Sequence, residues 1–171
     1  MSRIWVIGCM TLVLAGCAQP NPQRPSHRKG TAPQKDSTLV ALMEMNQRMT
    51  QAADEQLLHA VQGEEGAFAL YEHGTWAAIR QAGDRTRPVR PGETCTVSMQ
   101  VYALNGLLYR DIRQTAQAGK YELISAIDEN ITEWHHGARL TLYAPWYAAY
   151  GITGTEHIPP YENIRIELAI E

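Results

Sequence analysis

The fold is decided by one stretch near the C-terminal end, Pro145-Trp-Tyr-Ala-Ala-Tyr-Gly-Ile-Thr-Gly-Thr-Glu-His-Ile-Pro-Pro160. Pro145 ends the strand pattern that precedes it, and residues 148–151 fit a single turn of helix closed by a glycine. A loop that contains Gly154 follows. Residues 159–160 are prolines, which have no N–H to donate to a ladder and therefore mark the edge of a strand.

Strands are predicted on both sides of this stretch, because apolar and polar residues alternate there. In residues 138–143, Leu140 and Leu142 face one way and the residues between them face the other. Residues 164–170 repeat this pattern, with an apolar residue at every second position. Each strand therefore has one face in the core and one face toward solvent.

The order of these elements resembles the C-terminal half of an FKBP-type peptidyl-prolyl cis-trans isomerase. That order is a strand, a helical turn, a glycine loop, Ile-Pro-Pro and a closing strand. The family pattern, Pro-x-x-x-Ala-Tyr-Gly followed by Ile-Pro-Pro, is matched by Pro145, residues 149–151 and residues 158–160. The resemblance covers about Trp76 to Glu171. It implies an α+β fold, in which a twisted antiparallel sheet wraps one short helix and an N-terminal helical segment precedes the sheet.

The resemblance also implies a site that rotates peptidyl-prolyl bonds in proline-containing polypeptide clients. The family uses a tyrosine hydroxyl and a backbone N–H of the pocket helix as donors, and the matching groups are the hydroxyl of Tyr150 and the N–H of Ile124. The other matching pocket positions are Met99, Tyr109, Leu123, Ile127, Ile158 and Ile166. Because amide resonance holds up the barrier of roughly 18–20 kcal/mol, an apolar pocket that favours the twisted bond suffices. No cofactor or metal is implied.

The chain departs from the family pattern at the pocket. Ile127 stands where the family has a tryptophan floor, and Met99 and Ile166 replace aromatic residues on two strands. Arg110 replaces an aspartate at the rim, unless the local register makes Asp111 its equivalent. These departures predict weak catalysis, or a pocket that binds proline-containing segments without fast turnover.

The N-terminus has the pattern of a bacterial lipoprotein signal peptide. Arg3 is followed by an apolar run, residues 4–14, that is too short to span a bilayer, and Leu14-Ala15-Gly16-Cys17 fits a lipobox. We therefore expect residues 1–16 to be removed and Cys17 to carry acyl chains that hold the protein on a membrane. The expected location is the bacterial envelope, facing the periplasm, with the outer membrane favoured. An ordinary signal peptide is the alternative.

Residues 17–37 are proline-rich and polar, which predicts a flexible tether because such a segment buries too little apolar surface to fold. Cys9 leaves with the signal peptide and Cys17 takes the lipid. Cys95 then remains alone on a predicted strand, so we expect no disulfide within the chain and a buried, inert thiol.

Residues 38–61 give the clearest helix, which Ser37 caps and Gly63 stops. Its apolar stripe comprises Leu39, Leu42, Met43, Met49, Ala53, Leu57, Ala60 and Val61. A second short helix is expected over residues 64–72, so the helical segment is 38–72 and the domain is 73–171. The stripe either packs on this domain or serves as a contact for a protein partner or for self-association.

The first half of the domain is predicted as strands, a hairpin and one helix. The resemblance implies a strand over Trp76–Ala82. Thr94–Leu104 and Leu107–Ile112 are expected as strands from their sequence, with Asn105-Gly106 as the hairpin turn. Two further elements are a polar loop over 114–120, shorter than the flap of the family, and a helix over Leu123–Ile131.

Composition excludes some functions and leaves others open. The net charge is −3, so no basic field indicates nucleic-acid binding.

His135 and His136 are adjacent and point opposite ways on a strand, which favours surface histidines over a metal site with Glu133 and His157. Four aromatic residues either pack at the edges of the sheet or form an exposed patch: Trp134, Tyr143, Trp146 and Tyr147.

Three functions fit these features. The first is an extracytoplasmic prolyl isomerase that assists protein folding. The second is a catalytically degenerate FKBP-like chaperone or adaptor. The third is a structural envelope lipoprotein whose helix over residues 38–61 is the contact surface, similar to lipid-anchored (Bacteroidetes-like) members of the family that are associated with gliding machinery.

Overall fold

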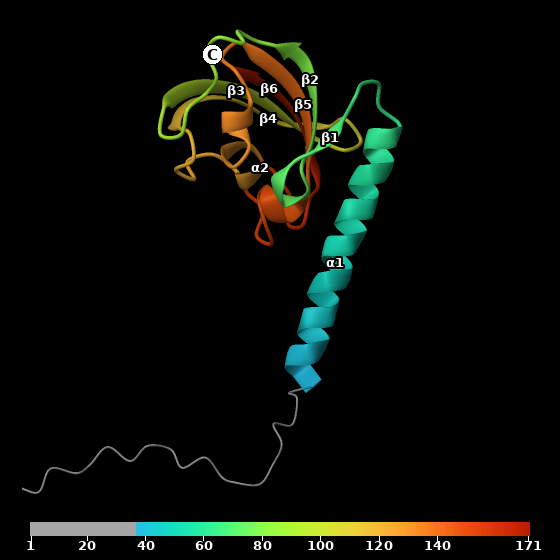
Figure 1. The fold of residues 1–171 in the computed structure, drawn as a ribbon. Helices are drawn as coiled ribbons and strands as arrows, with labels where there is room; N and C mark the ends of the chain where they lie inside the picture. The colour runs from blue at the N-terminus through green and yellow to red at the C-terminus, as the bar shows by residue number, and fades with distance from the viewer. Residues whose placement is uncertain (1–36) are drawn as a thin grey trace, which may run out of the picture. The chain divides into compact units, whose positions relative to one another are not determined.

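Six antiparallel strands form one sheet in the order β1-β2-β5-β6-β3-β4 (Figure 1). The computed structural model describes residues 37–171. The strands are β1 (Ala69–Leu70), β2 (Trp76–Ala82), β3 (Thr94–Ala103), β4 (Leu108–Gln117), β5 (Ala138–Ala144) and β6 (Ile164–Ile170). The helices are α1 (Ser37–Gln62) and α2 (Ser125–Asp128), with 3₁₀ turns η1 (Glu72–Gly74), η2 (Ile131–Glu133) and η3 (Trp146–Ala148). This is the predicted α+β fold.

Alternation of side chains gives the sheet two different faces. The face toward α2, called the inner face, carries the aliphatic residues of β3, β5 and β6, with Val101, Leu142 and Ile166 in register and all 0% exposed. The outer face carries Tyr102, Arg165 and Tyr143 in the next register position. Residues directly opposite in an antiparallel pair share a face, so the predicted alternation of side chains between two faces in β5 and β6 is confirmed. The expected solvent-facing side of β5 is wrong, because Thr141 and Tyr143 on the outer face are 1% and 4% exposed.

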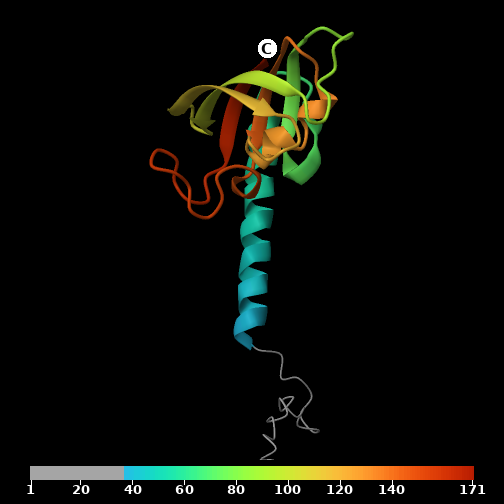
Figure 2. The same ribbon diagram turned by 90° about the vertical axis from the view of Figure 1, so that its left-hand side faces the viewer.

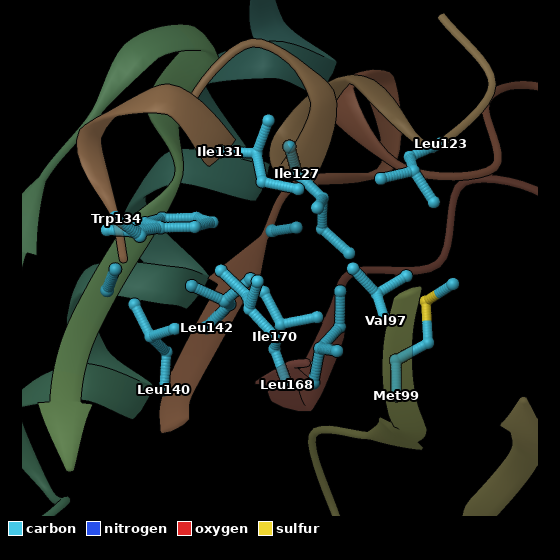
Figure 3. Packing of buried hydrophobic residues seen from close by; sticks show 14 of the residues in the cluster. Val97, Met99, Leu123, Ile127, Ile131, Trp134, Leu140, Leu142, Leu168 and Ile170 are labelled. Atoms are coloured by element: carbon cyan, nitrogen blue, oxygen red, sulfur yellow. The ribbon is translucent and has the colours of Figure 1, made fainter. Parts of the chain in front are cut away.

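The main core lies between the inner face and the segment from Leu123 to Trp134 (Figure 3). Ile127 and Ile131 lie over Leu142 and Ile170 in this view, and all four side chains are almost fully buried. Burial of such aliphatic side chains contributes about 1.5–3 kcal/mol each, so this layer supplies most of the hydrophobic stabilisation of the sheet.

A smaller apolar cluster lies on the outer face under α1. Ala53, Leu57 and Val61 recur every four residues and are the buried residues of the helix. Leu57 and Val61 pack with Tyr143 of β5, and four half-buried side chains complete the cluster: Ala60, Phe68, Trp76 and Leu104. The C-terminal half of the helix stripe therefore packs on the domain itself.

The N-terminal half of α1 extends beyond the sheet (Figures 1 and 2). Four of its apolar side chains are more than half exposed: Leu39, Leu42, Met43 and Met45. Residues 37–171 form one compact unit, so α1 and the sheet are not separate units. The described helices include none with the length and apolar character of a membrane span.

Several predicted elements differ from those observed. The helix expected over residues 64–72 is absent, and β1 and η1 take its place, because residues 69–70 pair with β2. The polar loop expected over 114–120 is wrong, since pairing with β3 carries β4 to Gln117. The helix expected over 123–131 shrinks to the four residues of α2 and the separate turn η2.

The deciding stretch also differs in detail from its prediction. The helical turn is η3, two residues earlier than expected, and the N–H of Gly151 closes it on the carbonyl oxygen of Trp146 at 2.8 Å. The strand edge expected at residues 158–160 is a loop, in which the N–H of Ile158 donates to the Thr155 hydroxyl. The predicted signal peptide, the lipidation site at Cys17 and the tether up to residue 36 lie outside the described residues.

Candidate functional site

A cavity of about 440 Å³ opens where β3, β4, the start of α2 and the residues after η3 meet. Its lining residues are Met99, Arg110, Ile112, Gln114, Tyr121, Glu122, Leu123, Ile124, Ser125, Ala149 and Tyr150. The volume is in the range of small-ligand sites.

The base of the cavity is the edge of the main core. Met99 and Leu123 are 3% and 7% exposed and belong to the core cluster, and Figure 3 shows both at the opposite end of that cluster from Trp134. Ile112, directly opposite Met99 in the β3–β4 ladder, adds a half-buried side chain. The sequence had indicated Met99 and Leu123 for the pocket.

The two predicted donors both lie at this cavity. Neither the hydroxyl of Tyr150 nor the N–H of Ile124 has a hydrogen-bond partner among the described residues. Ile124 precedes the first turn of α2, where N–H groups have no partner within the helix. Burial raises the pKa of Tyr150, against a smaller opposite effect of Arg110, so the hydroxyl keeps its proton at neutral pH.

The turn that carries Tyr150 is fixed from two sides. Asn163 accepts from the N–H of Trp146 at 2.9 Å and donates to the side chain of Gln56 in α1 at 2.7 Å. The hydroxyl of Tyr147 donates to Asp54 at 2.5 Å, and burial together with this bond raises the pKa of Tyr147. Helix α1 thus holds η3, which ends two residues before Tyr150.

Three predicted pocket residues lie in the core rather than on the cavity surface. Ile127, Ile158 and Ile166 are 0%, 1% and 0% exposed, and none lines the cavity. Tyr109 is half-buried, and its hydroxyl donates to Glu162 at 3.0 Å instead of lining the cavity. The structure therefore places the aliphatic replacement for the family's tryptophan beneath the surface that a ligand contacts.

Register settles which residue of β4 faces the cavity. Arg110 is opposite Val101, whose side chain is buried on the inner face, and Arg110 lines the cavity. Asp111 is opposite Gln100 on the outer face and accepts a hydrogen bond from its amide at 2.8 Å. The rim therefore carries an arginine where the family pattern has an aspartate.

Sequence reasoning missed several lining residues. Ile112 and Gln114 follow Arg110 at every second position, so continuing the β4 alternation past the predicted strand end would have found them. Tyr121 is 72% exposed and has a positive φ of 57°, with its N–H bonded to the carboxylate of Asp128. No simple sequence signal marks such a residue, because its position depends on that tertiary contact.

The predicted surface histidines and aromatic residues divide between core and surface. His136 is 7% exposed, which corrects the surface prediction, and its ring nitrogens contact the carbonyl oxygen of Glu171 and the carboxylate of Glu93. Trp134 and Tyr143 are buried, so they pack within the fold rather than form an exposed patch. Within residues 37–171, no group of three potential ligands is placed to hold a metal ion.

The remaining cysteine of the described chain behaves as its position predicts. Cys95 is buried in β3 and has no disulfide partner. Burial is the main cause that raises the pKa of its thiol. A protonated, buried thiol is a poor nucleophile, so Cys95 is structural.

Comparison with known proteins identifies the fold. No family model matches the sequence, and no curated protein shows significant sequence similarity. Among solved structures, the chain is similar to a peptidyl-prolyl cis-trans isomerase from Pseudomonas syringae pv. tomato, with a TM-score of 0.58 and 19% identity over 71% of this chain and 92% of that one. It is also similar to FkpA from Escherichia coli, with a TM-score of 0.60 and 18% identity over 78% of this chain.

These similarities define an FKBP-like α+β fold, the fold of FKBP-type peptidyl-prolyl isomerases. The chain spans 63% of the length of FkpA, so the match to that protein is partial.

Proposed function

We propose that this protein is a peptidyl-prolyl cis-trans isomerase that acts on proline-containing segments of polypeptide clients. One observation carries the proposal: in an FKBP-like fold, two donors without partners in the described chain, the hydroxyl of Tyr150 and the N–H of Ile124, share one cavity. Both residues are half-buried at the cavity, so their two donors are open to a ligand that supplies acceptors. The carbonyl oxygens that flank a proline are such acceptors.

The proposed mechanism needs no nucleophile and no acid. The planar peptidyl-prolyl bond is more charge-separated than the twisted transition state, so transfer from water onto the apolar base of Met99 and Leu123 favours the twisted form. Hydrogen bonds from Tyr150 and Ile124 hold the neighbouring carbonyls while the bond rotates. Catalysis here is therefore differential binding of the twisted bond.

The test is a prolyl-isomerisation assay on residues 37–171, which form one unit with its own core. Tyr150→Phe removes one hydrogen bond, worth about 0.5–1.5 kcal/mol, so we expect kcat/KM to fall about 2- to 12-fold. Tyr102→Phe is the matched control, because that hydroxyl bonds to Gln100 on the outer face. Equal rates for the native protein and Tyr150→Phe would overturn the assignment of Tyr150.

Binding without turnover is the second candidate function. It is favoured by the aliphatic base of the cavity. Ile127 stands where the family has a tryptophan floor, and it lies buried in the core without lining the cavity. Isothermal titration of proline peptides separates the two functions. Binding with no acceleration over the uncatalysed rate indicates a chaperone or adaptor.

The proposed location is the bacterial envelope, where acyl chains on Cys17 anchor the protein to a membrane, the outer membrane being favoured, with the domain facing the periplasm. The lipobox at residues 14–17 and the basic residue before the apolar run support it. Metabolic labelling with a palmitate analogue is expected to mark the native chain and not Cys17→Ala. Labelling of both chains contradicts the proposal.

The exposed half of α1 is proposed as a surface for protein contacts, with a partner or with a second copy. Leu39, Leu42 and Met43 are 58%, 53% and 64% exposed on one helix. Sedimentation of residues 37–171, with and without serine at these three positions, tests self-association. A monomer in both cases excludes it and leaves a different protein as the partner.

A further inference from the structure

The rim of the cavity carries a guanidinium that has no partner among the described residues. Arg110 lines the cavity and is half-buried, and its guanidinium takes part in no ion pair or hydrogen bond within residues 37–171. The other arginine of β4 differs in this respect, because Arg113 binds the carboxylate of Glu171, with its Nε at 3.1 Å. One strand therefore holds one paired and one unpaired arginine.

The two arginines lie on opposite faces of β4. Arg110 is opposite Val101, which is 0% exposed on the inner face, whereas Arg113 is opposite Ser98, whose hydroxyl also binds Glu171 on the outer face. The side chain of Arg110 is thus directed to the cavity side of the sheet. It is also close enough to Tyr150 to interact electrostatically with its hydroxyl.

Three acidic residues have partners other than Arg110: one in the cavity lining, one next to Arg110 in β4, and one bonded to Tyr109. Glu122, the acidic residue of the lining, accepts from the N–H of Gln117 at 2.9 Å. Glu162 accepts from Tyr109 at 3.0 Å. Asp111 accepts from Gln100 on the outer face. Arg110 therefore remains available to an acceptor from outside the described chain.

We propose that Arg110 forms a carboxylate-binding subsite, which selects clients that carry aspartate or glutamate next to the proline. The inference rests on the proposed function, since it assumes that the proline occupies this cavity. Arginine keeps its charge at any physiological pH and matches a carboxylate with two parallel donors, which a client carbonyl cannot equal. The donors of Tyr150, Ile124 and Arg110 then all meet acceptors of one segment.

The expected preference is modest because the rim is open to solvent. Ion pairs at such positions contribute little, so we expect about a two- to fivefold preference for glutamate over glutamine at low ionic strength. Salt screens exposed charges, and the preference is expected to shrink toward one at 0.5 M NaCl, where the screening length is only about 4 Å.

The experiment compares isosteric peptides that carry glutamate or glutamine immediately before or immediately after the proline. For residues 37–171 we expect a higher kcat/KM for glutamate at one of the two positions, and a ratio near one in Arg110→Gln. Arg113→Gln is the matched control: it removes the same charge from the same strand on the other face, so its ratio is expected to stay at the native value.

The outcomes separate the subsite from the isomerase function. Acceleration with equal rates for glutamate and glutamine at both positions overturns the subsite and leaves the isomerase function standing. Without acceleration of any peptide, the isomerase function fails, and isothermal titration of the same peptides decides the subsite by their affinities. Equal affinities for the two peptides, or no binding of either, also overturn the subsite. So does a preference for glutamate that is lost as much in Arg113→Gln as in Arg110→Gln.

Discussion

The two apolar clusters on the two faces of the sheet are built in different ways. On the inner face, the aliphatic side chains of three strands meet α2 in one continuous core. On the outer face, Leu57, Val61 and Tyr143 form a small cluster. The hydroxyl of Tyr143 also donates at 2.9 Å to Glu64, two residues after the end of α1, and Asn163 donates at 2.7 Å to Gln56 within the helix.

This difference assigns the two clusters different roles. Hydrophobic stabilisation scales with buried apolar area, so the inner core sets the stability of the sheet. The outer cluster buries little area and holds α1 partly by polar contacts, each of which contributes only about 0.5–1.5 kcal/mol. We therefore expect the free energy needed to detach α1 from the sheet to be smaller than the free energy needed to unfold the sheet.

The largest effect is expected in the inner core. Ile127→Ala leaves a cavity at a side chain that is 0% exposed, so we expect a loss of about 2–5 kcal/mol in the free energy of unfolding, measured by urea titration. Ile152→Ala, at a side chain 59% exposed, is the control and should change stability by less than about 0.5 kcal/mol. A loss below about 1 kcal/mol for Ile127→Ala would show that this core is not tightly packed.

A smaller effect is expected for Leu57→Ala in the outer cluster, about 2 kcal/mol, at the low end of the range because α1 can shift to fill the space. Leu57 is 0% exposed, and its neighbour Leu58, at 42%, provides a matched control. Hydrogen exchange should quicken along α1 and remain slow in β5 and β6. Uniformly faster exchange would mean that helix and sheet unfold together.

Alkaline pH tests the polar part of the same cluster. Burial and the bond to Glu64 raise the pKa of Tyr143 from 10 to about 12, which favours its neutral form in the folded state. This contribution is complete below pH 10, where the unfolded tyrosine still holds its proton, and is lost as the pH rises through about 12. Its size is about 2.7 kcal/mol.

The measurement is the difference in unfolding free energy between the native protein and Tyr143→Phe, taken at pH 9 and at pH 11.5. The native protein should lose stability relative to the variant between these values. A difference that does not change with pH would contradict the role of Tyr143.

The contact between α1 and η3 should contribute about 1 kcal/mol to the free energy of unfolding. Tyr147→Phe removes the hydrogen bond to Asp54 in an exposed setting, which limits its contribution. A double-mutant cycle with Asp54→Asn isolates the pair. If the turn positions Tyr150, Tyr147→Phe should also lower kcat while KM stays the same, and an unchanged kcat would restrict the contact to stability.

The smallest effect on stability is expected at the free end of α1. Leu42→Ser replaces a side chain that is 53% exposed, and the free energy of unfolding should change by less than about 0.5 kcal/mol. A larger loss measured at low protein concentration would reveal an intramolecular contact for this half of the helix.

The sequence predicted the elements whose residues face two environments. β6 alternates because one face is buried, and the stripe of α1 recurs with the helical period, so the bounds of β6 match their prediction. The bounds of β2 also match, but that strand was predicted from the resemblance to the family and not from alternation. The sequence underestimated β4, because residues 113–117 are polar on the outer face and only their pairing with β3 makes them a strand. Edge strands with few buried side chains are in general difficult to predict from hydrophobic alternation.

The cavity was only partly predictable for a different reason. Hydrophobicity indicates that Ile127, Ile158 and Leu123 are buried, but depth decides which of them a ligand touches, and only Leu123 reaches the surface of the cavity. The exposure of Arg110 to the cavity depends on strand register, which a single residue's shift reverses. The sequence therefore predicts which residues are apolar or charged, but the face of the sheet on which each side chain lies is known only from the pairing of the strands.

Helix α1 also has a mechanical consequence. From Asp54, which contacts η3, to Ser37 the helix measures about 25 Å at 1.5 Å per residue, and no apolar cluster of the described chain holds this arm. A sideways force at Ser37 acts through that arm as a torque at the contact of Asp54 with Tyr147. Load on the helix is therefore felt first at the turn that carries Tyr150.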